Sequence, residues 1–141
     1  MVVQRWGVRW PIHVVLGAFM VERATGRIVD LPGPPHYAPS GARFLSLSVC
    51  GDNCSNRIDI WSVDDGVAKL EWRYRIKERT EKAFTYEFVE WEGNEQIKLR
   101  ILPEIEAPGD LPGKVGDKSR SILASLTRTE QIWTLDPQLP Q

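Results

Sequence analysis

The sequence predicts an all-β fold of about nine short antiparallel strands, in propeller-blade-like sheets or in a small sandwich or barrel. Two observations lead to this prediction. Apolar and charged residues alternate with a period of two in several segments, as they do in strands that bury one face. Residues that tolerate positive φ separate these segments at short intervals, and such turns favour hairpins with antiparallel pairing.

The clearest alternation covers residues 69–77. Its apolar side chains occupy every second position and are expected to share one buried face: Leu70, Trp72, Tyr74 and Ile76. The charged residues between them, Glu71 among them, are then expected to face solvent. Residues 96–101 repeat the pattern, with Lys98 and Arg100 on the polar side.

Further strands follow from shorter apolar runs, over residues 14–21, 27–31, 44–50, 57–61, 84–88, 121–126 and 131–135. The run over residues 84–88 slips out of phase at Val89 and Trp91, which predicts a bulge or the end of a strand. The last two runs are expected to form the final hairpin.

The chain has 141 residues, and we expect one β-rich domain over residues 1–135 with a frayed tail over residues 136–141. The apolar run over residues 12–21 is shorter than the roughly 20 apolar residues that cross a bilayer. It therefore predicts a buried strand and no membrane span. Residues 103–118 are rich in proline and glycine, and they predict a long loop.

Charge and motifs restrict the possible partners. The formal net charge of −1 argues against a nucleic-acid partner, because such proteins neutralise phosphates with an excess of cations. The sequence has no phosphate-binding loop, dinucleotide fingerprint or nucleophile elbow, so we expect no cofactor and no catalytic residues. His13 and His36 are general bases only if the fold brings a nucleophile to one of them. The partner is then expected to be another protein, and the oligomeric state stays open.

The long loop is the first candidate for binding that protein. Leu111 is its apolar residue best placed to enter a pocket, with Asp110 and Lys114 on a polar rim. Prolines restrict the unfolded loop, so less entropy is lost when it is ordered. The alternative is a disordered connector.

The second candidate is an aromatic patch near the N-terminus. Trp6 and Trp10 each follow an arginine, which favours a surface that uses cation–π contacts. The alternative is a strand over residues 4–10 whose tryptophans pack inward.

Two cysteines, Cys50 and Cys54, are separated by three residues. This spacing differs from the CxxC redox motif, and only two histidines remain to complete a four-ligand zinc site, so no metal is expected. A disulfide between them would indicate a periplasmic or secreted protein, and free thiols a cytoplasmic one. The sequence leaves the compartment open.

Two acidic clusters are expected to be solvated turns. The first lacks the spacing of a calcium loop and consists of Asp52, Asn53, Asn56 and Asp59. The second surrounds Trp91 and consists of Glu87, Glu90, Glu92 and Glu95. Glu87 is expected on the polar face of a strand and Glu92 and Glu95 beside a turn, so a soluble hairpin tip accounts for the carboxylates without a glycoside-hydrolysing pair.

Three pieces of the chain resemble blades of a WD-repeat or related β-propeller. Residues 37–44 look like the turn that leads into a blade strand, and residues 25–28 look like the turn between blade strands. Ile58-Asp59-Ile60-Trp61, followed by Asp64-Asp65-Gly66, resembles a blade strand with its terminal dipeptide and turn. The resemblance covers roughly residues 25–102 and implies propeller-like sheets in an interaction scaffold.

The leading functional interpretation is a non-catalytic β domain that acts through protein–protein binding. One alternative is an exported inhibitor or immunity-type protein, which would present a protruding loop. Another is a small-ligand carrier, or an enzyme whose site forms only in the fold, which would present a deep apolar pocket. A scaffold would instead present a flat aromatic patch or an open sheet edge.

Overall fold

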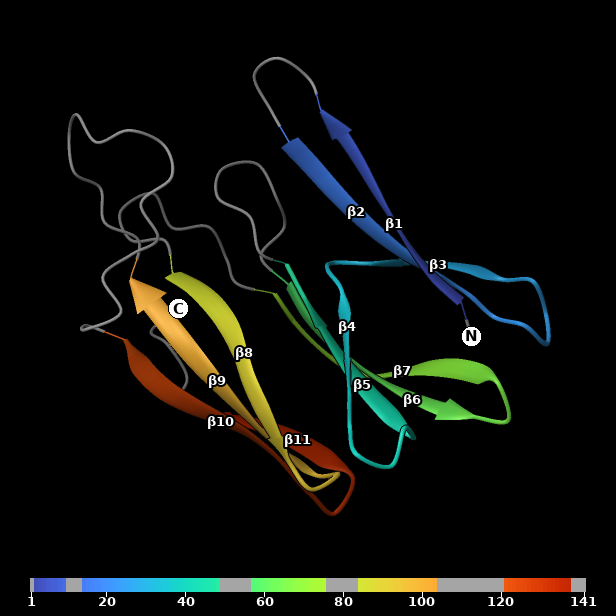
Figure 1. Cartoon of the computed structure of the whole chain (residues 1–141). Helices are drawn as coiled ribbons and strands as arrows, with labels where there is room; N and C mark the ends of the chain where they lie inside the picture. The colour runs from blue at the N-terminus through green and yellow to red at the C-terminus, as the bar shows by residue number, and fades with distance from the viewer. Residues whose placement is uncertain (1, 10–13, 49–56, 76–83, 104–120, 138–141) are drawn as a thin grey trace.

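The computed structural model describes residues 2–9, 14–48, 57–75, 84–103 and 121–137, and places the side chains of residues 18–48, 57–75, 86–102 and 121–137. These residues confirm the all-β prediction, because every regular element among them is a strand and every pairing is antiparallel (Figure 1). The strands are β1 (Val2–Arg9), β2 (Val14–Val21), β3 (Ile28–Leu31), β4 (Pro35–Tyr37), β5 (Arg43–Leu47), β6 (Arg57–Asp64), β7 (Val67–Arg75), β8 (Phe84–Glu92), β9 (Gln96–Pro103), β10 (Ile122–Thr129) and β11 (Ile132–Asp136).

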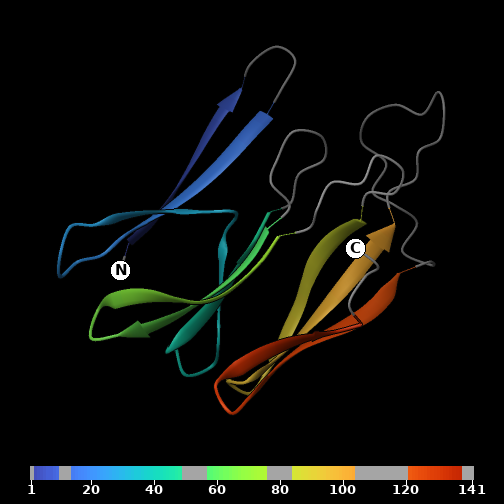
Figure 2. The same cartoon turned by 180° about the vertical axis from the view of Figure 1, so that it is seen from behind.

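The strands form three sheets that lie face to face in a row, as Figures 1 and 2 show from opposite sides. We call them the N-terminal sheet (β1–β3), the central sheet (β4–β7) and the C-terminal sheet (β8–β11). Strands that are neighbours in a sheet are also neighbours in chain order. Each described sheet has an edge strand at both ends, so none of the three is a closed barrel.

The larger apolar core fills the space between the central and C-terminal sheets. Its members from the central sheet are Leu45, Leu47, Ile58 and Ile60, and those from the C-terminal sheet include Ile97, Leu99, Ile101, Leu126 and Trp133. The predicted inward face of residues 96–101 is therefore confirmed. Each such side chain contributes about 1.5–3 kcal/mol when it is fully buried, so this core supplies much of the folding free energy.

A smaller core lies between the central and N-terminal sheets, and it consists of Ala18, Met20, Leu31, Phe44, Trp61 and Ala68. The rings of Phe44 and Trp61 stack with centroids 6.3 Å apart and planes 9° apart. Successive residues of β5 and β6 thus point into different cores. This explains why both strands are buried along most of their length.

A bulge in β7 overturns one detail of the predicted alternation. Ile60 pairs with Trp72 while Trp61 pairs with Leu70, so Glu71 is an extra residue without a partner in β6. Leu70 packs against the smaller core, whereas Trp72 and Tyr74 pack against the larger one. The expectation that Leu70 and Trp72 share a face is wrong, because the extra residue changes the phase between them.

A second bulge occurs in β8, where the sequence predicts a change of phase. Phe88 pairs with Leu99 and Glu90 pairs with Lys98, which leaves Val89 without a partner. Trp91 then pairs with Ile97 on the core side. The predicted irregularity at Val89 and Trp91 is confirmed.

The short edge strand β4 contains His36, which contacts the C-terminal sheet. His36 pairs with Leu45 in the central sheet, and its ring stacks on Phe88 of β8 with centroids 4.1 Å apart. The backbone carbonyl of His36 accepts a hydrogen bond from Trp91 Nε1 at 2.9 Å. His36 therefore joins two sheets.

The segment between β3 and β4 is held by a close contact between Gly33 and β5. The N–H of Gly33 donates to Ser46 Oγ at 3.1 Å, and the same hydroxyl donates to the Gly33 carbonyl at 2.7 Å. A Cβ atom on Gly33 would lie 2.0 Å from the backbone oxygen of Leu47. Only glycine fits here without displacement of the backbone.

The turn between β2 and β3 forms hydrogen bonds with the backbone at the edge of β7. Glu22 is 1% exposed, and its Oε1 accepts the backbone N–H of Ala68 at 2.9 Å. Arg27 pairs with Glu22 and donates to the Ala68 carbonyl at 2.5 Å, while Thr25 donates to Glu22 Oε2 at 2.7 Å. The Glu22–Arg27 pair thereby satisfies both backbone groups of Ala68, as a neighbouring strand would.

Candidate functional site

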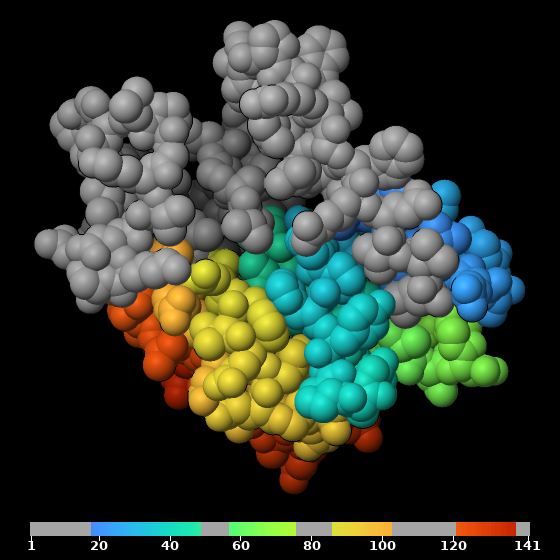
Figure 3. Space-filling model, in the orientation of Figure 1, coloured from blue at the N-terminus to red at the C-terminus, as the bar shows by residue number. Residues whose placement is uncertain are grey.

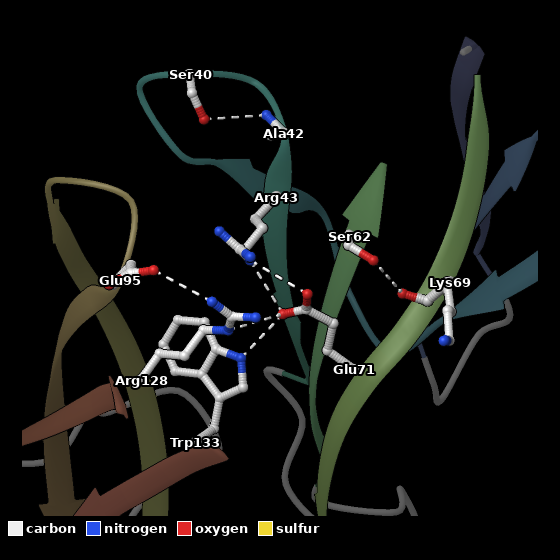
Figure 4. Close-up of polar contacts among 9 residues, drawn as sticks. All are labelled: Ser40, Ala42, Arg43, Ser62, Lys69, Glu71, Glu95, Arg128 and Trp133. Atoms are coloured by element: carbon white, nitrogen blue, oxygen red, sulfur yellow. Dashed lines mark hydrogen bonds and ion pairs between the residues drawn. The ribbon is translucent and has the colours of Figure 1, made fainter. Parts of the chain in front are cut away.

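Polar side chains converge where the central and C-terminal sheets meet (Figure 4). Arg43 Nε lies 3.0 Å from Glu71 Oε2, and Trp133 Nε1 donates to the same oxygen at 3.0 Å. Arg128 Nε lies 3.8 Å from that oxygen, and its Nη1 donates to Glu95 Oε1 at 3.1 Å. We call these five residues the inter-sheet cluster. Each sheet supplies one arginine and one glutamate to it.

The bulge in β7 places Glu71 in this position. A regular strand would alternate Glu71 away from the face that carries Trp72. As the extra residue, Glu71 instead reaches across to β10 and β11, and its side chain is only 17% exposed. Bulges commonly redirect one side chain in this way near functional sites.

The carboxylate of Glu71 is held in its charged form. Partial burial raises the pKa of Glu71. Hydrogen bonds from Trp133 and Arg43, together with the charges of Arg43 and Arg128, lower the pKa by more than burial raises it. The net result is a pKa below the ordinary value for glutamate. An ionised Glu71 is a hydrogen-bond acceptor and a counter-ion, and it holds no proton to give at neutral pH.

An open groove of about 680 Å³ adjoins the inter-sheet cluster, and it is lined by Ser40, Arg43, Glu92, Asn94, Glu95, Gln96, Thr127 and Arg128. The backbone N–H of Ser40 donates to Asn94 Oδ1 at 3.0 Å, so the two turns that border the groove are joined. In the space-filling view, β4 and β5 (cyan) pack directly against β8 (yellow) (Figure 3). A polar, open surface of this kind suits the polar groups of a macromolecule better than an apolar small ligand.

A second ion cluster lies within the central sheet and corrects the interpretation of Asp59. Asp59 is 0% exposed in β6, and Arg73 binds both of its carboxylate oxygens, at 2.8 Å and 3.0 Å. Arg57 Nε lies 3.1 Å from Asp59 Oδ2. The expectation that Asp59 belongs to a solvated turn is wrong, because two arginines neutralise the carboxylate inside the sheet. The other members of that predicted turn lie outside the described residues.

The acidic residues of β8 are engaged in cross-strand pairs. Lys98 Nζ lies 3.0 Å from Glu90 and 2.6 Å from Glu92, and Arg100 lies 2.9 Å from Glu87. Such exposed pairs are worth about 0–1 kcal/mol each, and they leave the outer face of the C-terminal sheet solvated.

No group of three or more His, Cys, Asp or Glu side chains in the described part of the chain is placed to hold a metal ion. Over the same residues, no helix has the length and apolar character needed to cross a bilayer. Most donors and acceptors of the inter-sheet cluster already pair with one another, whereas the buried Nε of Arg128, 3.8 Å from Glu71 Oε2, forms no hydrogen bond with the described residues. The arrangement of the cluster therefore positions two sheets and shapes a groove.

Most residues proposed from the sequence as binding sites lie outside the described residues: Leu111, Asp110, Lys114, Trp10, Cys50 and Cys54. Trp6 belongs to β1, where its backbone lies opposite Gly17, and its side chain is outside the described set. The expectations for these residues stay predictions.

Sequence reasoning missed the residues of the inter-sheet cluster. Arg43 and Arg128 lie far apart in the chain, and only the packing of two sheets brings them to one carboxylate. One usable signal is Trp133, because a buried indole N–H needs an acceptor. Comparison of the chain with protein-family models, curated proteins and solved structures finds no match.

Proposed function

We propose that this chain is a non-catalytic β domain that binds another protein, at the rim where the groove meets the β10–β11 hairpin. The observation that carries this proposal is Ile132, which is 67% exposed. It lies on the same face of β11 as Thr134, and Thr134 pairs with Thr127 of the groove lining. An exposed apolar side chain beside polar groups has the anatomy of a protein interface, with an anchor and a polar rim.

The hairpin presents this anchor on a regular scaffold. Glu130 and Gln131 form its turn with φ values of 51° and 70°, as in a type I′ turn, whose twist matches that of the flanking strands. Ile132 follows the turn directly, and Trp133 beside it is buried in the larger core. A side chain held in this way loses little conformational entropy when it is bound.

The charges of the groove support a partner that is neither strongly acidic nor strongly basic. Arg43 and Arg128 are balanced in the lining by Glu92 and Glu95. The whole chain has a formal net charge of −1. A polyanion such as nucleic acid would meet as many carboxylates as guanidinium groups at this surface.

The alternatives drawn from the sequence find less support in the described residues. A carrier or enzyme needs an enclosed apolar pocket, whereas the groove is open and polar. The protruding loop expected of an inhibitor, over residues 103–118, lies almost wholly outside the described residues. The open edge expected of a scaffold is present at β11.

The order of strands also supports the resemblance to propeller blades. The central and C-terminal sheets each consist of four strands in chain order, and they pack face to face. Blades of a β-propeller are four-stranded sheets of this kind, arranged around a channel. We therefore propose an interaction scaffold built from blade-like sheets.

The test compares two isoleucines with matched exposure. Wild type, Ile132→Lys and Ile28→Lys are used as baits in the native source, since Ile28 is 68% exposed but belongs to the N-terminal sheet. A protein captured by wild type and by Ile28→Lys, but lost with Ile132→Lys, supports the proposal once its affinity is measured with purified components. Equal capture by all three baits refutes the assigned surface.

A further inference from the structure

The β10–β11 and β6–β7 hairpins have the same construction, and this defines which backbone groups face outward. Each closes through a two-residue turn with positive φ at both positions, Asp65-Gly66 and Glu130-Gln131. Such turns are flanked by a hydrogen-bonded pair, and hydrogen-bonded and non-hydrogen-bonded pairs alternate from there. The N–H and C=O groups of Ala68 in β7, and of Trp133 and Leu135 in β11, therefore point away from their hairpin partners.

The two edges differ in what covers these groups. At β7 the Glu22–Arg27 pair binds the N–H and the C=O of Ala68, and Glu71 forms a bulge farther along the strand. At β11 no described side chain bonds to the outward groups, and the pairing with β10 is regular over its whole length.

Other described edges carry recognised protections. Strand β4 begins with Pro35, β8 has a bulge at Val89, β1 contains Arg5 and Arg9, and the four-residue β3 has Asp30 within the strand. Proline, bulges and short or charged strands all prevent the addition of another strand. Strand β11 has the sequence Ile-Trp-Thr-Leu-Asp, without proline or a cation. Its one charged residue, Asp136, is the last of the strand, so the edge over residues 132–135 lacks such protection and carries β-branched and aromatic residues.

We propose that two copies of this chain pair antiparallel through β11, around a two-fold axis at Thr134. In this register Trp133 of one copy lies opposite Leu135 of the other, so their outward N–H and C=O groups bond to each other. On the outer face Thr134 meets its own copy and Ile132 lies opposite Asp136. No two like charges are directly opposed, and Thr–Thr pairs across strands are favourable.

This self-pairing goes beyond the proposed function, because it uses the backbone edge of β11 and does not depend on Ile132 as an anchor. The C-terminal sheets of the two copies would form one continuous sheet. A single short strand buries less area than a standard interface, so a reversible dimer with a dissociation constant of about micromolar or weaker is expected.

Cross-linking tests the register directly. Thr134→Cys places two cysteines opposite each other at the axis, in a non-hydrogen-bonded pair whose Cα atoms lie about 4.5 Å apart, within disulfide range. Thr127→Cys is the matched control, since it lies on the same face but one strand farther from the axis. Wild type, with Cys50 and Cys54, gives the background. A disulfide-linked dimer specific to Thr134→Cys is expected; equal yields for both variants overturn the proposal.

Sedimentation velocity of the full chain gives an independent measurement. Thr134→Lys opposes two like charges at the axis and should weaken the dimer about tenfold or more, whereas Thr129→Lys on β10 should leave it unchanged. Wild type that stays monomeric up to its solubility limit overturns self-pairing.

Ile132→Lys should keep the dimer, because the introduced ammonium group would face Asp136 of the other copy. Loss of a captured partner and loss of the dimer are therefore separate results, and either proposal can fail alone.

Discussion

Glu71 and Trp133 are joined by a hydrogen bond of 3.0 Å that links the edge strands of two different sheets. Glu71→Ala would leave the indole N–H and two guanidinium groups without this acceptor. We expect a loss of about 3 kcal/mol in unfolding free energy, as when one partner of a largely buried ion pair is removed. Denaturant unfolding measures the change. Glu92→Ala, which removes an exposed ion pair, is the control and should cost less than about 1 kcal/mol; equal losses would contradict the assigned role of Glu71.

Glu22 should make stability depend on acid pH. Hydrogen bonds from Arg27, Thr25 and the Ala68 backbone lower the pKa of Glu22 to about 2, from an ordinary value of 4.5. Since the folded-state pKa is depressed, the contribution of Glu22 is complete above about pH 4.5 and is lost as the pH falls towards 2. The difference in denaturant midpoint between wild type and Glu22→Gln should therefore shrink across this range. A difference that is constant from pH 6 to pH 2, roughly the span over which a carboxylate titrates, would exclude this linkage.

Asp59→Asn should destabilise the central sheet by about 3 kcal/mol, because it leaves Arg73 and Arg57 with an uncompensated charge in a buried setting. Asp64→Asn changes an exposed residue of the same strand and should stay within about 0.5 kcal/mol of wild type. Equilibrium denaturation of the two variants provides the comparison. An unfolding free energy of Asp59→Asn equal to that of wild type would mean that the two arginines become solvated when the carboxylate is lost.

Gly33→Ala should cost about 3 kcal/mol or more, because its methyl group would meet the backbone oxygen of Leu47. Gly93→Ala is the matched control: its added Cβ meets open space, and its φ of 69° costs an alanine about 1 kcal/mol. Thermal melts of both variants rank the two effects. If Gly93→Ala proved the more harmful, the close approach of Gly33 to β5 would be wrong.

The sequence predicts much of this fold because strand periodicity is a local property. The alternation in residues 96–101 corresponds to a strand with one face in the larger core, and the change of phase at Val89 corresponds to a bulge. Strand β4 escapes prediction because three residues with a proline carry no period. The predicted face of Leu70 is wrong because β7 contains an extra residue, Glu71, which the alternation of its apolar residues does not reveal.

The polar sites could not be read from the sequence, since they depend on contacts between distant strands. Asp59 lies among polar residues along the chain, and only the pairing of β6 with β7 sets it beside Arg73. Arg43, Glu71 and Arg128 belong to three strands in two sheets. Local patterns indicate that such residues are charged, but the packing of the sheets decides which charges meet.

The bulge at Glu71 also has a genetic consequence. An in-frame deletion of its codon would leave Trp72 opposite Ile60 and Leu70 opposite Trp61, so both apolar faces of β7 would keep their register. Such a deletion would remove the contacts of Glu71 with Arg43, Arg128 and Trp133 but leave the pairing of β6 with β7 intact. Deletion of the Arg73 codon would instead turn the residues beyond it to the opposite face. Natural variation in the length of this strand should therefore be confined to position 71.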